Sequence, residues 1–493
     1  MRSGKSWGFT IGTAAIFLGC IGLTGSFALK AAPAPGSSGE VTFSKDIAPI
    51  LQRSCQNCHR PDGVAPMSLV SYEDARPYAR AIKQRTSIGP HAGVMPPWYV
   101  EKNIGIQQFK DDPSLSDAEI AMIGKWVDAG APQGNPADMP APRQFDDLTK
   151  WNIGTPDLII KTQEQLVKAN APDWWGEIPS VPTGLTEDRY VSALEVKEVN
   201  DVPKDGSGRT TVGGRFVFHH MIWSTRVLSA DSDAADFVTG QDDGTTGWPV
   251  HEVGRNADYF APEAARLLKA GSSLVSNSVH IHSNGRDTRA HLEIGFKFMP
   301  KGYEPKYKTA RVGLGNGVDI DIHPMEANQR LDAYAVLTEN VKIISFEPHL
   351  HAPGSRMCLE AIWGINVQTL NCVGYDHNWV RGYNYADDAA PLIPKGAVLH
   401  IIGYMNNSPS NKNVPDPRNW QGSGNRSVAN MFIDLGQRVA LTDAQFKAEM
   451  QARVQKLHLT RNDVPIGCPL CMLMPGAAAT PGANVGQQQQ QQQ

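Results

Sequence analysis

The sequence predicts a multidomain protein, in which a small all-α domain precedes two tandem all-β domains of a sandwich, jelly-roll-like type. Three observations lead to this expectation. Apolar residues at helical spacing occur between residues 41 and 142, a Pro-rich segment from Ala131 to Pro142 closes that region, and short β-rich runs fill the chain after about residue 150. A chain of 493 residues has room for about three domains.

The N-terminus has the features of an export signal over residues 1–28. Basic residues precede an interrupted apolar stretch, and Ser26-Phe27-Ala28 supplies the small residues that a signal peptidase reads. A weak lipobox ending at Cys20 and an uncleaved membrane anchor are the alternatives, which leave membrane association through the N-terminus open. All three place the folded part outside the cytoplasm. We expect residues 29–40 to be a linker.

Capping signals define the helices of residues 41–142. Ser44 is the expected cap of a helix that runs through Ile47 and Leu51, and Ser116 with Glu119 forms a capping box before a closing helix.

The stretch Cys55-Gln56-Asn57-Cys58-His59 carries the clearest chemistry in the sequence. Two thiols three residues apart can add to the vinyl groups of one porphyrin, and the adjacent His59 then lies under the iron as its proximal ligand. The alternatives for a C-x-x-C pair are a thiol redox couple or half of a zinc site. The adjacent histidine and the export signal favour one covalently attached haem c.

We expect the sixth iron ligand to be Met95, in a loop that Pro96 and Pro97 stiffen. Met67 and His91 are the alternatives. A helix, the haem motif, a loop and a closing helix form the plan of a class I cytochrome c, so residues 41–142 are interpreted as a cytochrome c domain.

The remainder of the chain is predicted to fold as two β-sandwiches, residues 143–315 and 316–440, dividing near Gly313 to Gly317. A C-terminal helix over residues 441–460, capped by Thr442 or Asp443, follows them, and residues 461–493 contain a C-x-x-C segment and a glutamine tail expected to be disordered. The predicted strands are Arg215–Leu228, His291–Met299, Val341–Phe346, Leu359–Trp363 and Val398–Tyr404.

Four of the seven cysteines are left over after the signal and the haem motif. A hairpin turn centred on Ile365 would place Cys358 opposite Cys372, so a cross-strand disulfide is expected there. Cys468 and Cys471 are expected to close a short disulfide loop, with a copper-loading or docking segment as the alternative.

Three histidine groups stand in the β-rich region: His219-His220, His280-Ile281-His282 and His349-Leu350-His351. Residues i and i+2 of a strand share a face, so a His-x-His pair can chelate one metal ion. Adjacent histidines point to opposite faces, and joint ligation by His219 and His220 therefore needs a bulge or a strand end. The other histidines have no metal-ligand spacing and are interpreted as structural or exposed; they are His251, His291, His323, His377, His400 and His458.

The chain resembles the copper type II, ascorbate-dependent monooxygenases, the family of peptidylglycine hydroxylating monooxygenase and dopamine β-monooxygenase. The resemblance spans roughly residues 180–440 and depends on Phe218-His219-His220-Met221, a later histidine before Asn-Gly, Pro348 to Gly354, and the final Asn430-Met431. It is closer to bacterial proteins that carry a cytochrome c ahead of that module.

Two copper ions are what the resemblance implies. The first would take His219, His220 and His282, and the second would take His349, His351 and Met431 as the catalytic set. His280 is the alternative to His282, and Met405 is the competitor of Met431, because this chain has Ala429-Asn430 where the relatives carry an acidic pair. A thioether beside two imidazoles suits Cu(I), the state that meets dioxygen. Each copper would lie in one sandwich, facing the other across an open cleft.

The function expected from these sites is that of a periplasmic or otherwise exported bacterial oxidoreductase, a monooxygenase that receives electrons through its cytochrome domain. Its expected partners are an external redox protein as electron donor and a small-molecule or peptide-like substrate. The alternatives are a non-catalytic electron-transfer or copper-binding protein, and a sandwich scaffold without copper. A formal charge of −4 does not indicate the excess of basic residues that is typical of nucleic-acid-binding proteins.

Overall fold

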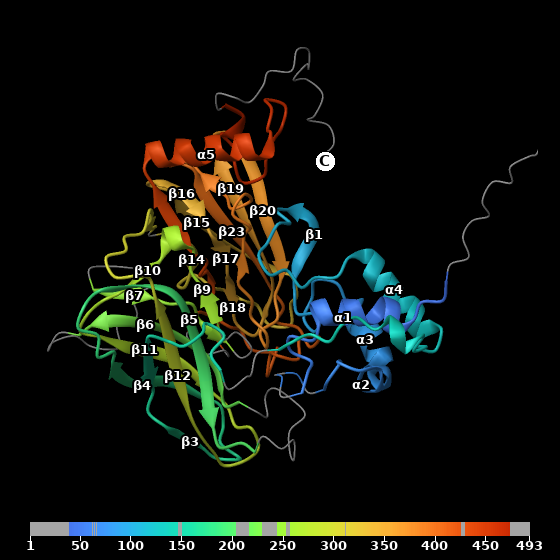
Figure 1. Ribbon diagram of the computed structural model, residues 1–493. Coiled ribbons are helices and arrows are strands. Elements are labelled where there is room, and N and C mark those ends of the chain that lie inside the picture. The colour runs from blue at the N-terminus through green and yellow to red at the C-terminus, as the bar shows by residue number, and fades with distance from the viewer. Residues whose placement is uncertain are drawn as a thin grey trace, which may run out of the picture. The chain divides into compact units, whose positions relative to one another are not determined.

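The computed structural model (Figure 1) describes residues 39–61, 63, 65, 67–145, 150–203, 216–228, 244–252, 257–310, 312–424 and 429–473. The predicted signal, nearly all of the predicted linker and the glutamine tail therefore lie outside the described residues. From Val41 onward the chain belongs to one unit. Among the described residues, no helix combines the length and the apolar character that crossing a membrane requires.

The helices of the N-terminal region lie together (Figure 1). They share an apolar core that includes Phe43, Ile47, Leu51 and Trp126. The Ser116–Glu119 capping box is confirmed at the start of the closing helix. The expected cap at Ser44 is wrong: the helical segment begins two residues earlier, with Thr42 in the extended cap position and Ser44 buried in the first turn. The helical segments are η1 Phe43–Ile47, α1 Ala48–Ser54, α2 Tyr72–Ala75, η2 Arg76–Tyr78, α3 Ala79–Thr86, α4 Asp117–Asp128 and η3 Pro136–Asp138.

The described part of the chain is mostly β-sheet after residue 150, as predicted. Two sheets enclose a core that includes Trp223, Leu274, Leu292 and Phe296. One sheet has the strand order β10-β5-β12-β2, with β3 and β9 paired to its sides, and the other has the order β4-β11-β6-β7, with β8 paired to β6. The strands are β2 Leu158–Lys161, β3 Gln165–Val167, β4 Trp174–Pro182, β5 Arg189–Asn200, β6 Phe218–Val227, β7 Thr245–Gly247, β8 His251–Glu252, β9 Ala257–Tyr259, β10 Arg266–Leu268, β11 Ser272–Ile281 and β12 Thr288–Phe298.

A second group of sheets surrounds another core, in which Leu350, Met357, Leu399 and Phe432 are completely buried. Its main sheet has the order β1-β20-β19-β23-β15, and smaller sheets have the orders β13-β25-β16-β22, β14-β24-β18 and β17-β21. The strands are β13 Lys308–Thr309, β14 Gly315–Asn316, β15 Gln329–Val336, β16 Asn340–Ile343, β17 Ser345–Phe346, β18 Pro348–Leu350, β19 Gly354–Trp363, β20 Asn366–Gly374, β21 Tyr383–Asn384, β22 Leu392–Ile393, β23 Val398–Met405, β24 Phe432–Asp434 and β25 Arg438–Leu441.

The first strand of that main sheet comes from the N-terminal region. β1, Val100–Gly105, lies between α3 and α4 in the sequence but pairs with β20. Trp98, Val100 and Ile106 are buried in the same core as the strands of the second sandwich. The helical region is therefore attached to this sheet by a strand and by apolar packing, in addition to the Pro-rich segment that ends at Pro142.

Both predicted disulfides are present. Cys358 lies directly opposite Cys372 in the β19–β20 hairpin, and the two sulfur atoms are bonded. Cys468 and Cys471 form the short loop, and both are completely buried. Such bridges are typical of exported proteins, with which the fold is compatible.

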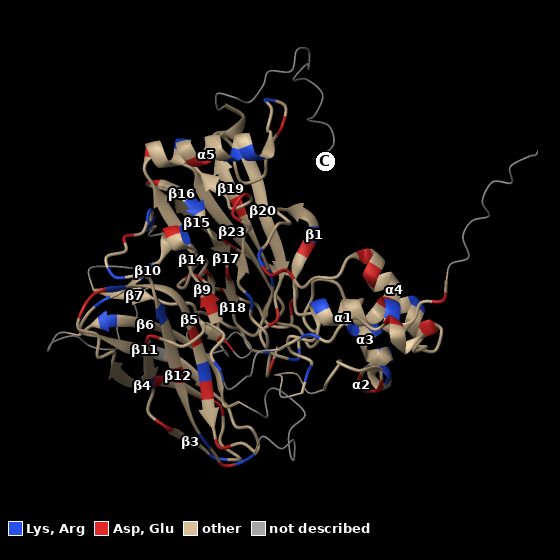
Figure 2. Ribbon diagram, in the orientation of Figure 1, with Lys and Arg blue, Asp and Glu red and all other residues tan. Residues whose placement is uncertain are grey.

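The predicted C-terminal helix is α5, Asp443–Leu457, and Thr442 caps it through a capping box with Gln445. It contacts β16, β22 and β25, and a short turn, η6 Cys471–Leu473, follows it. Both acidic and basic residues occur along α4 and along α5 (Figure 2).

Candidate metal centres

The Cys55–His59 motif forms a tight turn directly after α1. The N–H groups of Cys58 and His59 donate to the carbonyl oxygen of Cys55, at 3.1 and 3.0 Å. The two thiols do not form a disulfide. Burial raises the pKa of Cys55 to about 12 and also raises that of Cys58, so both thiols are protonated at neutral pH. A redox couple needs a reactive thiolate, which this environment disfavours.

The imidazole of His59 is buried, with one ring nitrogen next to a backbone carbonyl. His59 is only 9% exposed, and its Nδ1 lies 3.2 Å from the carbonyl oxygen of Met67. Burial lowers the pKa of His59, which favours the neutral ring. A neutral ring that donates from Nδ1 to a carbonyl presents Nε2 as the ligand atom, the usual arrangement of metal-binding histidines.

The residues expected to supply the sixth ligand differ in exposure. Met95 is 39% exposed, and its N–H donates to the carbonyl oxygen of Arg85 at 3.2 Å, which fixes the loop against α3. Met67 is half-buried and packs against the helical core, whereas His91 is exposed. Ligation by Met95 stays a prediction.

The first histidine group lies where β6 and β11 pair. His220 is opposite His280, but the next pair joins Phe218 to Ile281, so His219 occupies a bulge. The bulge turns two adjacent histidines toward the same region, as joint ligation requires. Ligand atoms of His219, His220 and His280 all lie within 4.8 Å of one another.

His280, the alternative to His282, belongs to this tightest group. Its Nε2 lies 3.1 Å from a carboxylate oxygen of Asp173, and Trp175 stacks on its ring with centroids 3.7 Å apart. These contacts fix the ring and direct Nδ1 toward the other histidines. His282 follows β11 directly, and its ring centroid is 5.6 Å from that of His219. The structure thus places both members of the His-x-His pair near His219.

The second group lies at the end of β18, where His349 and His351 are almost completely buried and their ring centroids are 5.5 Å apart. Strand β24 runs antiparallel beside them, with His349 opposite Ile433. Met431 is half-buried and directly precedes β24; continuing this register by two residues, past the end of both strands, would set it opposite His351. The competitor Met405 is completely buried in the core of the second sandwich.

His377 is the residue that the sequence interpretation missed. It follows β20, and its ring centroid is 5.9 Å from that of His219 and 6.4 Å from that of His351. Neither a His-x-His pattern nor a neighbouring histidine marks it in the sequence. Only the path of the chain after β20 brings it to the other rings.

The two groups are neighbours, with the ring centroids of His220 and His349 6.4 Å apart. The resemblance implied two sites that face each other across an open cleft. These distances instead place the two histidine groups next to each other. We call the connected rings the histidine cluster; among the described residues its members are His219, His220, His280, His282, His349, His351 and His377.

Several ring nitrogens of the histidine cluster are buried without a hydrogen-bond partner. Burial, reinforced by neighbouring imidazoles, lowers the pKa of His219 to about 4, of His377 to about 3 and of His280 to about 2. Histidine binds metal ions through a neutral ring with an unpaired nitrogen. A bound ion would give these buried nitrogens a partner, and a buried nitrogen without a partner destabilises the folded protein. The atoms are His219 Nδ1, His220 Nε2, His280 Nδ1, both nitrogens of His349, and His377 Nδ1.

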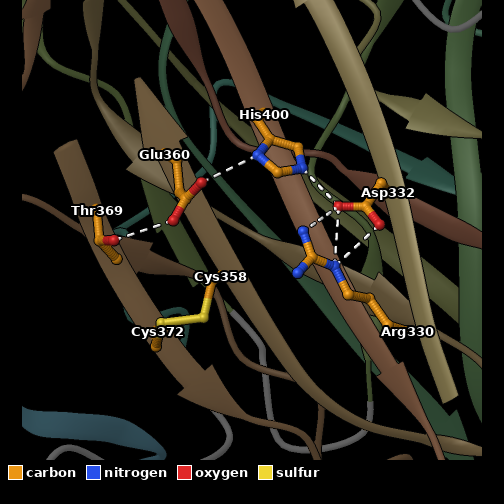
Figure 3. Close-up of polar contacts among 7 residues, drawn as sticks. All are labelled: Arg330, Asp332, Cys358, Glu360, Thr369, Cys372 and His400. Carbon is orange, nitrogen blue, oxygen red and sulfur yellow. Dashed lines mark hydrogen bonds and ion pairs between the residues drawn. A yellow bond between two sulfur atoms is a disulfide. The ribbon is translucent and has the colours of Figure 1, made fainter. Parts of the chain in front are cut away.

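His400 shows the opposite arrangement on the outer face of the main sheet (Figure 3). Its Nδ1 lies 2.9 Å from a carboxylate oxygen of Glu360, and its Nε2 lies 2.7 Å from one of Asp332. Thr369 and Arg330 hold these two carboxylates in turn. Both ring nitrogens are used within the protein, which agrees with the structural role expected for His400.

The loop that carries Met95 contacts the segment that carries His377. The N–H of Gly93 donates to a carboxylate oxygen of Asp376 at 3.0 Å, and the N–H of Gly374 donates to the carbonyl oxygen of Tyr99 at 2.8 Å. A Cβ at Gly374 would lie 1.7 Å from the carbonyl oxygen of Pro90, so the close approach of the two segments requires glycine there.

Comparison of the chain with models of known protein families and with curated proteins gives no match. The assignment of chemistry to these sites therefore depends on the residues and geometry described above.

Proposed function

We propose that this chain is an exported haem c- and copper-dependent oxidoreductase that hydroxylates a C–H bond with dioxygen. The observation that carries the proposal is the histidine cluster, in which nitrogens of His219, His220, His280, His349 and His377 are buried without a hydrogen-bond partner, in the same chain as a C-x-x-C-H motif. Imidazole ligands suit copper, and a thioether beside imidazoles favours its reduced state. Haem and copper, when bound, would supply one-electron transfer and dioxygen chemistry.

The side chains of this protein would hold the two kinds of cofactor in distinct ways. Cys55 and Cys58 would form the thioether bonds to haem, and His59, held by the carbonyl of Met67, would ligate iron. His219 and His220, with His280 or His282, would bind one copper ion. His349, His351 and Met431 would bind the other, with His351 oriented by a contact of 3.1 Å between its Nδ1 and the carbonyl oxygen of Ala429.

The proposed reaction consumes a C–H compound, dioxygen, two electrons and two protons, and yields the alcohol and water. The electrons would come from an external redox protein through the cytochrome domain, and the substrate would be a small or peptide-like molecule. The two sandwiches would exclude water from the cluster, since His349 and His351 are 2% and 1% exposed.

The same burial favours a second candidate, a non-catalytic electron-transfer or copper-binding protein. Such a protein needs metal ligands but no access for a substrate, and the near-complete burial of His349 and His351 suits it.

Replacement of Met431 by leucine tests the proposal. We expect the M431L variant to keep its haem spectrum and to lose at least about tenfold in dioxygen consumption with a competent C–H substrate, because the site loses its thioether. Met405→Leu is the matched control: a volume-conserving change in the core costs less than about 1.5 kcal/mol of stability and leaves the copper sites intact.

Copper and iron content is measured on the same samples. Two copper ions per haem in the wild type, with turnover lost only in M431L, is the expected result. Electron transfer to a partner without dioxygen-dependent product in any variant would favour the carrier, and wild-type protein that binds no copper would refute the proposal.

A further inference from the structure

The site at His349 and His351 has fewer imidazoles than its neighbour. Four histidines, His219, His220, His280 and His282, surround the first proposed site, and ligand atoms of three of them lie within 4.8 Å of one another. The second has His349 on β18, His351 directly after that strand, and Met431 directly before β24, the strand that pairs with β18. An ion bound there has room for a further nitrogen ligand in a four-coordinate shell.

His377 lies next to that site with an unused nitrogen. The residue is directed into the cluster, since its ring centroid is 6.4 Å from that of His351 and 5.9 Å from that of His219. Two imidazoles on one ion have ring centroids about 4.5–6 Å apart, given metal–nitrogen bonds of about 2 Å. The separation from His219 falls inside this range and that from His351 lies just beyond it. Because four imidazoles already surround the first site, the smaller ligand set of the second site decides the assignment of His377 to it. Its Nδ1 is buried without a hydrogen-bond partner.

The backbone beside His377 is held on both sides. Asp376 accepts hydrogen bonds from the N–H groups of Gly93 and Asn378, each at 3.0 Å. Gly374, at the end of β20, donates to Tyr99. The imidazole is thus carried by a backbone segment that is anchored to the loop of residues 90–99.

We propose that His377 is a metal ligand that completes a three-imidazole set with His349 and His351. The proposal rests on the copper function proposed above and extends it, because neither the spacing of the histidines nor the family resemblance assigns His377 a role. With Met431, the second ion would then have three nitrogens and one sulfur as ligands. The segment of His377 would also be the point at which the loop of residues 90–99 meets a ligand of copper.

Copper titration of the full-length haem protein tests this assignment. We expect His377→Ala to bind one of its two copper ions at least about tenfold more weakly, the scale on which supporting residues already affect metal affinity. The nitrogen hyperfine pattern of the Cu(II) electron paramagnetic resonance signal should change with it. His323→Ala is the control, because the His323 side chain is 62% exposed and lies outside the cluster. His377→Asn, a smaller polar replacement, repeats the test if the alanine variant folds poorly.

A double variant decides which ion His377 serves. In a His349→Ala background, which retains only the first site, adding His377→Ala should cause no further loss of copper. A further loss would overturn the assignment to the second site, and unchanged affinity and spectrum in His377→Ala alone would overturn ligation. Wild-type protein that binds no copper would refute the proposed function and this inference together, whereas the other two results leave the proposed function standing.

Discussion

Hydrogen-bond partners separate the two kinds of buried histidine in this chain. His400 has a carboxylate at each ring nitrogen and needs no ion. His349 has no hydrogen-bond partner at either nitrogen, although it is 2% exposed. Burying an unpaired polar atom costs about 1–3 kcal/mol. A bound ion removes that cost, so the contrast supports metal binding at His349 without reference to any relative.

The haem motif allows a direct test at the residue scale. Replacing Cys55 and Cys58 with alanine should abolish covalent haem, because no thioether can form. Haem staining after denaturing electrophoresis measures this. The pair Cys468→Ala and Cys471→Ala is the control and should retain stained haem, since those cysteines are bonded to each other. Covalent haem in the Cys55/Cys58 variant would refute the assignment.

A single helix or hairpin can be predicted from the local sequence when residues close in the chain determine its geometry. The β19–β20 hairpin has Cys358 opposite Cys372 because a short turn fixes the register. The bulge at His219 was required by the chemistry expected of adjacent histidines, and the pairing of β6 with β11 contains it. The first helical turn, η1, starts earlier than expected because Thr42, and not Ser44, occupies the extended position that precedes it.

Helix α5 is held to the second sandwich by a charged contact that gives a pH-dependent prediction. Glu449 accepts hydrogen bonds from Tyr307, Lys306 and Lys342, with the two lysine contacts at 3.1 and 3.2 Å. Burial opposes ionisation, but the hydrogen bonds and the charge of Lys342 outweigh it and lower the pKa of Glu449 from 4.5 to about 2.

The lowered pKa means that the unfolded state binds more protons than the folded state between pH 4.5 and about 2. The contribution of Glu449 is therefore fully present above pH 4.5 and is lost as the pH falls toward 2. We expect Glu449→Gln to lower the midpoint of thermal unfolding at pH 6 and to have little effect near pH 2. An equal difference from wild type at both pH values would contradict this account.

At the scale of the whole molecule, the N-terminal region and the second sandwich share a core. Trp98, Val100 and Ile106 are buried among strands from residues 314–432, and Arg356 pairs with Glu101 of β1. The Pro-rich segment to Pro142 therefore does not by itself set the position of the N-terminal helical region. A shared core also brings the loop of Gly93 to Asp376, beside the histidine cluster.

This shared core predicts that residues 41–142 are unstable alone. Removing the sandwiches would expose Trp98, Val100 and Ile106, which are 8%, 8% and 3% exposed in the whole chain. We expect the isolated region to unfold at a lower temperature than in the full-length protein and to bind a dye specific for apolar surface. Serine at all three positions should reduce dye binding. A fragment that matches the full-length protein in both measurements would contradict the prediction.

Spacing along the chain was enough to predict the two disulfides and much of the local geometry of this protein. The C-x-x-C-H spacing, the His-x-His pairs and the hairpin cysteines are relations between residues close in the chain, where the reach of a few backbone bonds decides what can meet. Tertiary structure alone decided which histidines come together. His377 joins the cluster, and His280 its tightest group, because strands distant in the sequence pair side by side, and β1 enters a distant sheet because its apolar side chains are buried there. Such contacts depend on how whole sheets pack against each other, and the spacing of residues along the chain does not predict that packing.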